Sequence, residues 1–175
     1  YENWAFLRPL IVPLHRRGYR VHVVAALGHN RSPITDGAAM VLDLLAARDL
    51  RDVVLVGHSK GGLIGKLAML GDTDGRISSL VTICTPFHGS SRARLLPLPS
   101  VAPLAPGHPS LVALGDPHPV NARITSLGTT FDEHVPEGSG LPGARNLVLD
   151  VPGHFRPLGH PEVLAEVLAV LEATP

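Results

Sequence analysis

One short stretch constrains the fold of this chain more than any other feature. An apolar run at residues 52–56 leads directly into a G-x-S-x-G turn, and a helical stretch at residues 60–70 follows without a break. A serine on so sharp a turn takes strained backbone angles, and the glycines two positions before and after it remove Cβ atoms that would collide with the adjoining strand and helix. The sequence therefore predicts a strand, a tight turn and a helix, with the hydroxyl of Ser59 lifted clear.

The same turn indicates nucleophilic chemistry. It places the main-chain N–H of Lys60 at a helix N-terminus, where it can donate to the oxyanion of a tetrahedral intermediate. A phosphate-binding loop is the alternative, but the G-x-x-x-x-G-K-[ST] spacing is absent. We expect His58 to pack beside the turn rather than to act as a base. The Lys60 side chain is expected to be solvated or to line the mouth of the site.

Short β-branched runs alternate with helical periodicity along the whole chain, which is typical of a mostly parallel sheet with helices on both faces. The pattern predicts a single α/β domain over residues 1–175, with a kink at the prolines of its first helix. The expected strands are residues 20–26, 52–56, 79–84, 123–128 and 146–151, and the expected helices are residues 4–17, 36–47, 60–70 and 162–172.

Residues 95–119 break this alternation. The segment contains seven prolines among apolar residues, which predicts a poorly helical excursion from the domain. Two interpretations stay open at this point: a surface loop stiffened by proline, or a small lid or acyl-chain wall over the site.

Composition excludes several classes of function. Lys plus Arg and Asp plus Glu both number 15 and are scattered, so the chain has no basic footprint for nucleic acid. No apolar stretch approaches the roughly 20 residues that span a bilayer, so we expect no membrane-spanning segment. The single Cys84 lies in an apolar run and is expected to be a buried structural thiol. The histidines lack H-x-x-x-H and H-E-x-x-H spacings, so no metal site is assigned.

A serine nucleophile needs a histidine base and a carboxylate that holds the imidazole in the right tautomer. Asp132 comes just after the strand expected at 123–128, and His154 just after the one expected at 146–151. Both would lie on neighbouring loops at the carboxyl edge of the sheet, where sites of parallel sheets gather. His160 is the main alternative base. The other competitors are Glu133, Asp150, His134 and His118.

With these residues in place, the chain resembles the α/β-hydrolase superfamily, and in particular small bacterial lipases and esterases with almost no cap. The resemblance covers nearly the whole chain. It rests on Val56-Gly57-His58-Ser59-Lys60-Gly61-Gly62, Thr85-Pro86-Phe87-His88-Gly89-Ser90, the Asp132-x-x-Val135 pattern and Gly143-Ala144-Arg145-Asn146. It implies an α/β-hydrolase fold and a Ser59, His154, Asp132 triad, with Lys60 as one oxyanion donor.

The chain departs from that family in two places. Lys60 replaces the uncharged residue that usually follows the nucleophile. The turn that carries the family's first oxyanion donor is not in the chain, and residues 1–4 look like those that follow it. We therefore expect a central strand upstream of the sequence given, and we expect residues 1–175 alone to be insoluble or inactive.

The sequence-based hypothesis is a serine hydrolase that cleaves carboxylic esters, lipid-like ones above all, through an acyl-enzyme and without a cofactor. Its expected partner is a small molecule with a hydrophobic acyl group. The alternatives on the same fold are a ligand-binding protein with little turnover and an acyl transferase.

Overall fold

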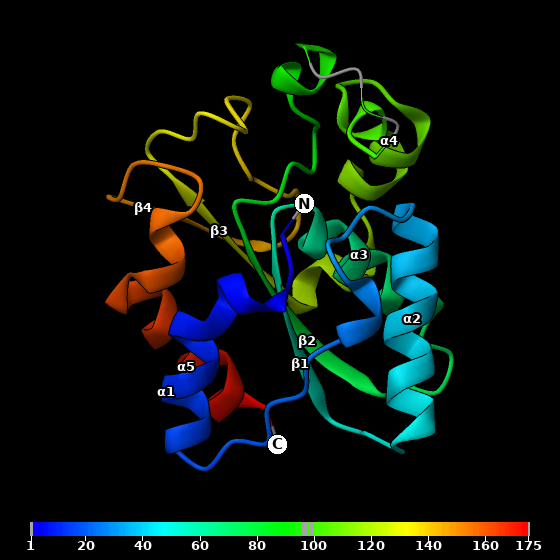
Figure 1. The fold of residues 1–175 in the computed structure, drawn as a ribbon, viewed down its shortest axis with the longest axis vertical. Coiled ribbons are helices and arrows are strands. Elements are labelled where there is room, and N and C mark those ends of the chain that lie inside the picture. The colour runs from blue at the N-terminus through cyan, green and yellow to red at the C-terminus, as the bar shows by residue number, and fades with distance from the viewer. Residues whose placement is uncertain (1, 96–97, 99, 175) are drawn as a thin grey trace.

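The computed structural model describes residues 2–95, 98 and 100–174, and its centre is a four-stranded sheet. All neighbouring strands run parallel, in the order β1-β2-β3-β4, and four of the five expected strands are present (Figure 1). The parallel α/β prediction is therefore confirmed. The strands are β1 (Val53–His58), β2 (Ile77–Ile83), β3 (Ile124–Thr129) and β4 (Arg145–Leu149).

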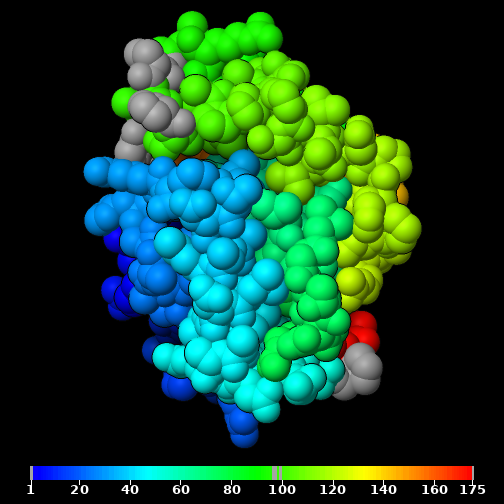
Figure 2. All heavy atoms as spheres, turned by 90° about the vertical axis from the view of Figure 1, so that its right-hand side faces the viewer, coloured from blue at the N-terminus to red at the C-terminus, as the bar shows by residue number. Residues whose placement is uncertain are grey.

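Helices cover both faces of the sheet (Figure 1). On one face α2 (Ile34–Ala47) packs beside α3 (Lys60–Gly71), and Figure 2 shows the two helices side by side. On the other face lie α1 (Arg8–Arg16) and α5 (Pro161–Ala173). Each face has its own core of buried side chains, and both cores include residues of β2, because a doubly covered parallel strand is apolar on both sides.

The register of the strands brings their carboxyl ends to one edge of the sheet. His58 is paired with Ile83, and Thr129 with Leu149. The ladder continues one step beyond β1, because the N–H of Ser59 donates to the carbonyl of Ile83 at 2.8 Å. The residues that follow β1, β2, β3 and β4 therefore meet at the same edge, where sites in open α/β sheets form.

The prediction of a strand at residues 20–26 is wrong. Residues 19–24 are in no ladder, and a short 3₁₀ helix, Ala25–Leu27, follows them. A strand needs a neighbouring strand to receive its N–H and C=O groups. Among the described residues β1 is the outermost strand on this side, and no ladder joins it to residues 19–24.

The helix expected at residues 4–17 is present in two parts, a 3₁₀ turn at Trp4–Leu7 and then α1. Pro9 lies in the first turn of α1, where its missing N–H costs nothing. None of the helices in the described part of the chain is long and apolar enough to cross a membrane.

The excursion at residues 95–119 is more helical than expected. Residues 96, 97 and 99 lie outside the described residues, but α4 (Pro109–Gly115) is a regular helix that begins with proline. Leu111 and Leu114 of α4 are buried in the core on the α3 side. The buried ammonium of Lys66 on α3 donates to the carbonyl of Leu114 at 2.5 Å and so holds the C-terminal end of α4. Pro109 therefore begins a packed helix within the excursion.

Candidate active site

Ser59 stands on a strained turn between β1 and α3. Its φ of 52° and ψ of −124° are unusual for a residue with a side chain, and such strain persists only where the surroundings enforce it. The close packing around the turn requires glycine at position 57, as expected, and at position 62, whereas a Cβ on Gly61, two positions after Ser59, would meet nothing within 4 Å. A Cβ on Gly57 would lie 2.6 Å from the carbonyl carbon of Gly61, and one on Gly62 would overlap the Thr85 side chain. The turn therefore has the geometry of a nucleophile elbow.

Helix α3 begins at Lys60, the residue after Ser59. The N–H of Lys60 is one of the first helical donors, which have no acceptor within the helix. Both residues line a cavity of about 80 Å³ at the end of β1. The remaining lining residues are Glu2, Asn30, His58, Ser100, Val101 and Leu104.

The Lys60 side chain is not solvated, which corrects one of the two expectations for it. Its ammonium donates to the carbonyl of Ser32 at 2.5 Å and to that of Asn30 at 3.1 Å. Burial lowers the pKa of this amine. The side chain therefore ties the loop before α2 to the elbow and forms part of the cavity wall.

Asp132 and His154 form a buried pair at the same edge of the sheet. The Nδ1 atom of His154 lies 2.8 Å from Oδ2 and 3.1 Å from Oδ1 of Asp132. Oδ1 also accepts the main-chain N–H groups of His134 at 2.8 Å and Val135 at 2.9 Å. Burial opposes ionisation of Asp132, but the hydrogen bond and charge of His154 and the two N–H donors outweigh it, so its pKa lies below the usual value. The pair is therefore arranged as a carboxylate that orients an imidazole.

The loops that carry this pair are neighbours, as the sequence predicts. The N–H of Thr130 donates to the carbonyl of Leu149 at 3.1 Å, and the N–H of Gly153 donates to that of Phe131 at 2.7 Å. The competing candidates lie elsewhere or point away. His160 and His118 cap helices, Asp150 is exposed, the half-exposed Glu133 carboxylate pairs with His134 at 3.3 Å, and His134 stacks on the outside of the His154 ring at 4.8 Å.

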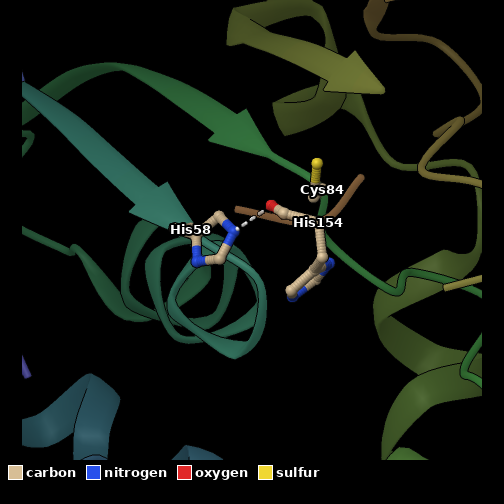
Figure 3. Close-up of side chains that lie close together, drawn as sticks. All are labelled: His58, Cys84 and His154. Atoms are coloured by element: carbon tan, nitrogen blue, oxygen red, sulfur yellow. Dashed lines mark hydrogen bonds between the residues drawn. The ribbon is translucent and has the colours of Figure 1, made fainter. Parts of the chain in front are cut away.

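The elbow contacts the Asp132–His154 pair through His58, the residue before Ser59. No hydrogen bond joins the Ser59 hydroxyl to His154 in the described part of the chain. Instead, the His58 ring packs against the His154 ring with centroids 4.7 Å apart, and its Nε2 atom lies 2.9 Å from the His154 carbonyl oxygen (Figure 3). The structure therefore brings the elbow and the Asp132–His154 pair to one place, where His58, the neighbour of Ser59, contacts His154.

Two residues at this place were not expected there. Glu2 contacts the Nδ1 atom of His58 at 2.6 Å, and Cys84 lies beside both histidines (Figure 3). Cys84 is fully buried, as predicted, and burial together with the Asp132 carboxylate raises the pKa of its thiol far above the usual range. No local sequence pattern predicts either contact. Glu2 and His58, for example, are 56 positions apart.

His58, Cys84 and His154 have atoms close enough together to hold a metal ion. The ring nitrogens of His58 are already bonded to Glu2 and to the His154 carbonyl, and Nδ1 of His154 is bonded to Asp132. A metal would also need the thiolate of Cys84, which its high pKa disfavours. The donor set is therefore built for hydrogen bonding within the protein.

A parallel sheet, a serine elbow between strand and helix, and a buried Asp–His pair at the carboxyl edge are together features of the α/β-hydrolase fold. The chain belongs to the alpha/beta hydrolase fold family, whose model matches residues 1–107. No curated protein sequence matches it significantly.

Solved structures share this fold at low sequence identity. The chain is similar to the mature lipase BlEst2 of Bacillus licheniformis, with a TM-score of 0.63 and 20% identity over 81% of this chain and 76% of the lipase. It is also similar to the Rv0554 protein of Mycobacterium tuberculosis, with a TM-score of 0.65 and 19% identity over 99% of this chain and 87% of that one. A hydrolase from Oleispira antarctica gives a TM-score of 0.62 and 17% identity over 99% and 88%. At these identities the likeness shows the fold alone.

Proposed function

We propose that the chain is a serine hydrolase that cleaves carboxylic esters through an acyl-enzyme. One observation carries this proposal: the strained Ser59 elbow and the buried Asp132–His154 pair meet at one edge of the sheet. A serine hydroxyl is a weak nucleophile at neutral pH, and such a pair is what activates it.

The reaction follows from the roles that these groups can take. Asp132 accepts a hydrogen bond from the Nδ1–H group of His154, which leaves Nε2 as the basic nitrogen. Nε2 takes the hydroxyl proton as the Ser59 oxygen attacks the ester carbonyl, and the Lys60 N–H donates to the oxyanion. The protonated His154 returns that proton to the departing alkoxide. Water then attacks the acyl-enzyme in the same way and releases the acid, so the cycle needs no cofactor.

The cavity beside Ser59 supports a substrate with a hydrophobic acyl group. Val101 and Leu104 contribute apolar surface from the excursion to a lining that also includes the polar Asn30 and Glu2. In this interpretation the excursion acts as an acyl-chain wall. Two structurally similar proteins are described as a lipase and an esterase, which agrees with this class of substrate.

The test is hydrolysis of a series of p-nitrophenyl esters of increasing acyl length by the full-length protein. We expect turnover in the parent and a loss of about 10⁶-fold in Ser59→Ala, because the nucleophile is gone while the turn tolerates the smaller side chain. Added alcohol would divert the acyl group to a new ester if the protein is an acyl transferase. A Ser59→Ala variant with parental turnover would contradict the proposal.

A further inference from the structure

His58 is a buried residue whose contacts the proposed reaction does not use. It ends β1 and directly precedes Ser59, and its ring lies between two oxygen atoms. Nδ1 is 2.6 Å from the Glu2 carboxylate, and Nε2 is 2.9 Å from the main-chain oxygen of His154 (Figure 3 shows the second contact). Both distances are those of good hydrogen bonds.

The number of N–H donors that the two contacts need defines the protonation state of the His58 ring. A carbonyl oxygen and an ionised carboxylate can only accept, whereas a neutral imidazole has a single N–H. Both contacts can be hydrogen bonds at once only if His58 carries a proton on each nitrogen, with Glu2 as its counter-charge. Burial opposes ionisation of Glu2, but the hydrogen bond and charge of His58 outweigh it and hold the pKa of Glu2 below the usual value. The carboxylate form is therefore the one that faces the ring.

The contact with His154 is made to its backbone and not only to its ring. His58 holds the carbonyl of His154, and Asp132 holds Nδ1 of the imidazole. The His58 ring also packs against the His154 ring. The residue that would act as the base is thus held both at its main-chain carbonyl and at its side chain.

We propose that His58, charged and anchored by Glu2, is a positioning residue that fixes His154 relative to Ser59. The catalytic role of His58 rests on the proposed function. Because His58 and Ser59 are adjacent in the chain, a hydrogen bond from His58 to the His154 carbonyl links the loop of the base directly to the elbow of the nucleophile. The distance between base and nucleophile then depends on one buried ring.

Substitutions that imitate one ring nitrogen at a time separate this role from packing. In His58→Gln the side-chain amide reaches the position of Nε2 and can still donate to the His154 carbonyl. In His58→Asn the amide reaches only the position of Nδ1, so the contact with Glu2 survives and the one with His154 is lost. Both variants lose the ring, so the difference between them reports which of the two contacts, that with His154 or that with Glu2, matters for turnover.

We expect kcat for ester hydrolysis to fall about 10²-fold in His58→Asn, as for misplacement of a reacting group by about 1 Å, and by no more than roughly tenfold in His58→Gln. In Glu2→Gln the carboxamide can donate to Nδ1, so a neutral His58 keeps both contacts and kcat stays within roughly tenfold of the parent. Equal kcat values for His58→Gln and His58→Asn would overturn the proposal.

A second measurement does not depend on turnover. Nitrogen-15 NMR of labelled histidines in the full-length protein, assigned with His58→Gln, should show both ring nitrogens of His58 protonated at neutral pH, and one of them unprotonated in Glu2→Gln. Because Asp132, Glu133 and His134 also surround His154, all variants are compared at the same pH. A neutral His58 ring in the parent refutes the proposal whether or not the protein hydrolyses esters. A doubly protonated ring without ester turnover would support the anchoring by Glu2 and overturn only the proposed function.

Discussion

Gly61 and Gly62 are adjacent in the elbow, yet the structure predicts opposite effects of adding one methyl group. A Cβ on Gly62 would lie 2.9 Å from both Cβ and Cγ2 of Thr85 and would overlap its hydroxyl, whereas a Cβ on Gly61 meets nothing within 4 Å. Thr85 is β-branched and fully buried, and its hydroxyl donates to the Ser59 carbonyl at 3.0 Å. It cannot move aside without breaking that bond.

Overpacking of this kind costs about 1–3 kcal/mol. For a chain of this size, each 1 kcal/mol shifts the melting temperature by about 2–4 °C, so Gly62→Ala should melt roughly 2–12 °C below the parent. Gly61→Ala lies inside α3 and should gain about 0.5–1 kcal/mol, because alanine loses less backbone entropy there.

Calorimetry of the two variants beside the parent gives the comparison directly. Turnover should fall in Gly62→Ala, because displacement of Thr85 disturbs the backbone of Ser59, and it should be retained in Gly61→Ala. If Gly62→Ala melts as high as Gly61→Ala, the close approach of α3 to the segment after β2 is not as described.

Three further predictions concern the charged groups. Asp132→Asn should lower kcat by about 10⁴-fold with little structural change, because an amide favours the wrong imidazole tautomer; a larger effect of Glu133→Gln in the same ester assay would move the acid by one residue. His154→Ala should be nearly as damaging as Ser59→Ala and not additive with it, whereas His160→Ala, which alters only the N-terminus of α5, should be mild; a reversed ranking in kcat would transfer the base to His160. Burial lowers the pKa of Lys66 from 10.5 to about 8, so between these pH values the unfolded chain binds more protons at this residue and the free energy of unfolding rises with pH; in denaturant titrations Lys66→Met should lack that rise, and an unchanged slope would contradict it.

The sheet and the Asp132–His154 pair could be predicted because their signals are local. Each observed strand contains a short apolar run and ends at the same edge, and Asp132 and His154 lie on the loops that follow two of those ends. The wrong strand at residues 20–26 has the same apolar character. Sequence composition reports burial, but a strand also needs a partner for its backbone, and that partner is a property of the whole fold.

The other differences have similar causes. Proline argued against helix throughout the excursion, yet Pro109 lies in the first turn of α4, where proline is well tolerated. The expectation of a solvated Lys60 side chain, one of the two for this residue, is wrong because the carbonyls of Asn30 and Ser32 that hold the ammonium come from a loop about 30 positions away. The link from Glu2 through His58 to His154 spans 56 and then 96 positions, so no local pattern could reveal it.

The central claim is that Ser59 is a nucleophile activated by His154. Reaction of the full-length protein with a fluorophosphonate, followed by intact mass measurement and peptide mapping, tests it most directly, because the reagent needs both an activated serine and an oxyanion site. We predict a single adduct, on Ser59, that is absent in Ser59→Ala and forms far more slowly in His154→Ala. An adduct on another residue, or labelling of Ser59→Ala at the parental rate, would contradict the claim.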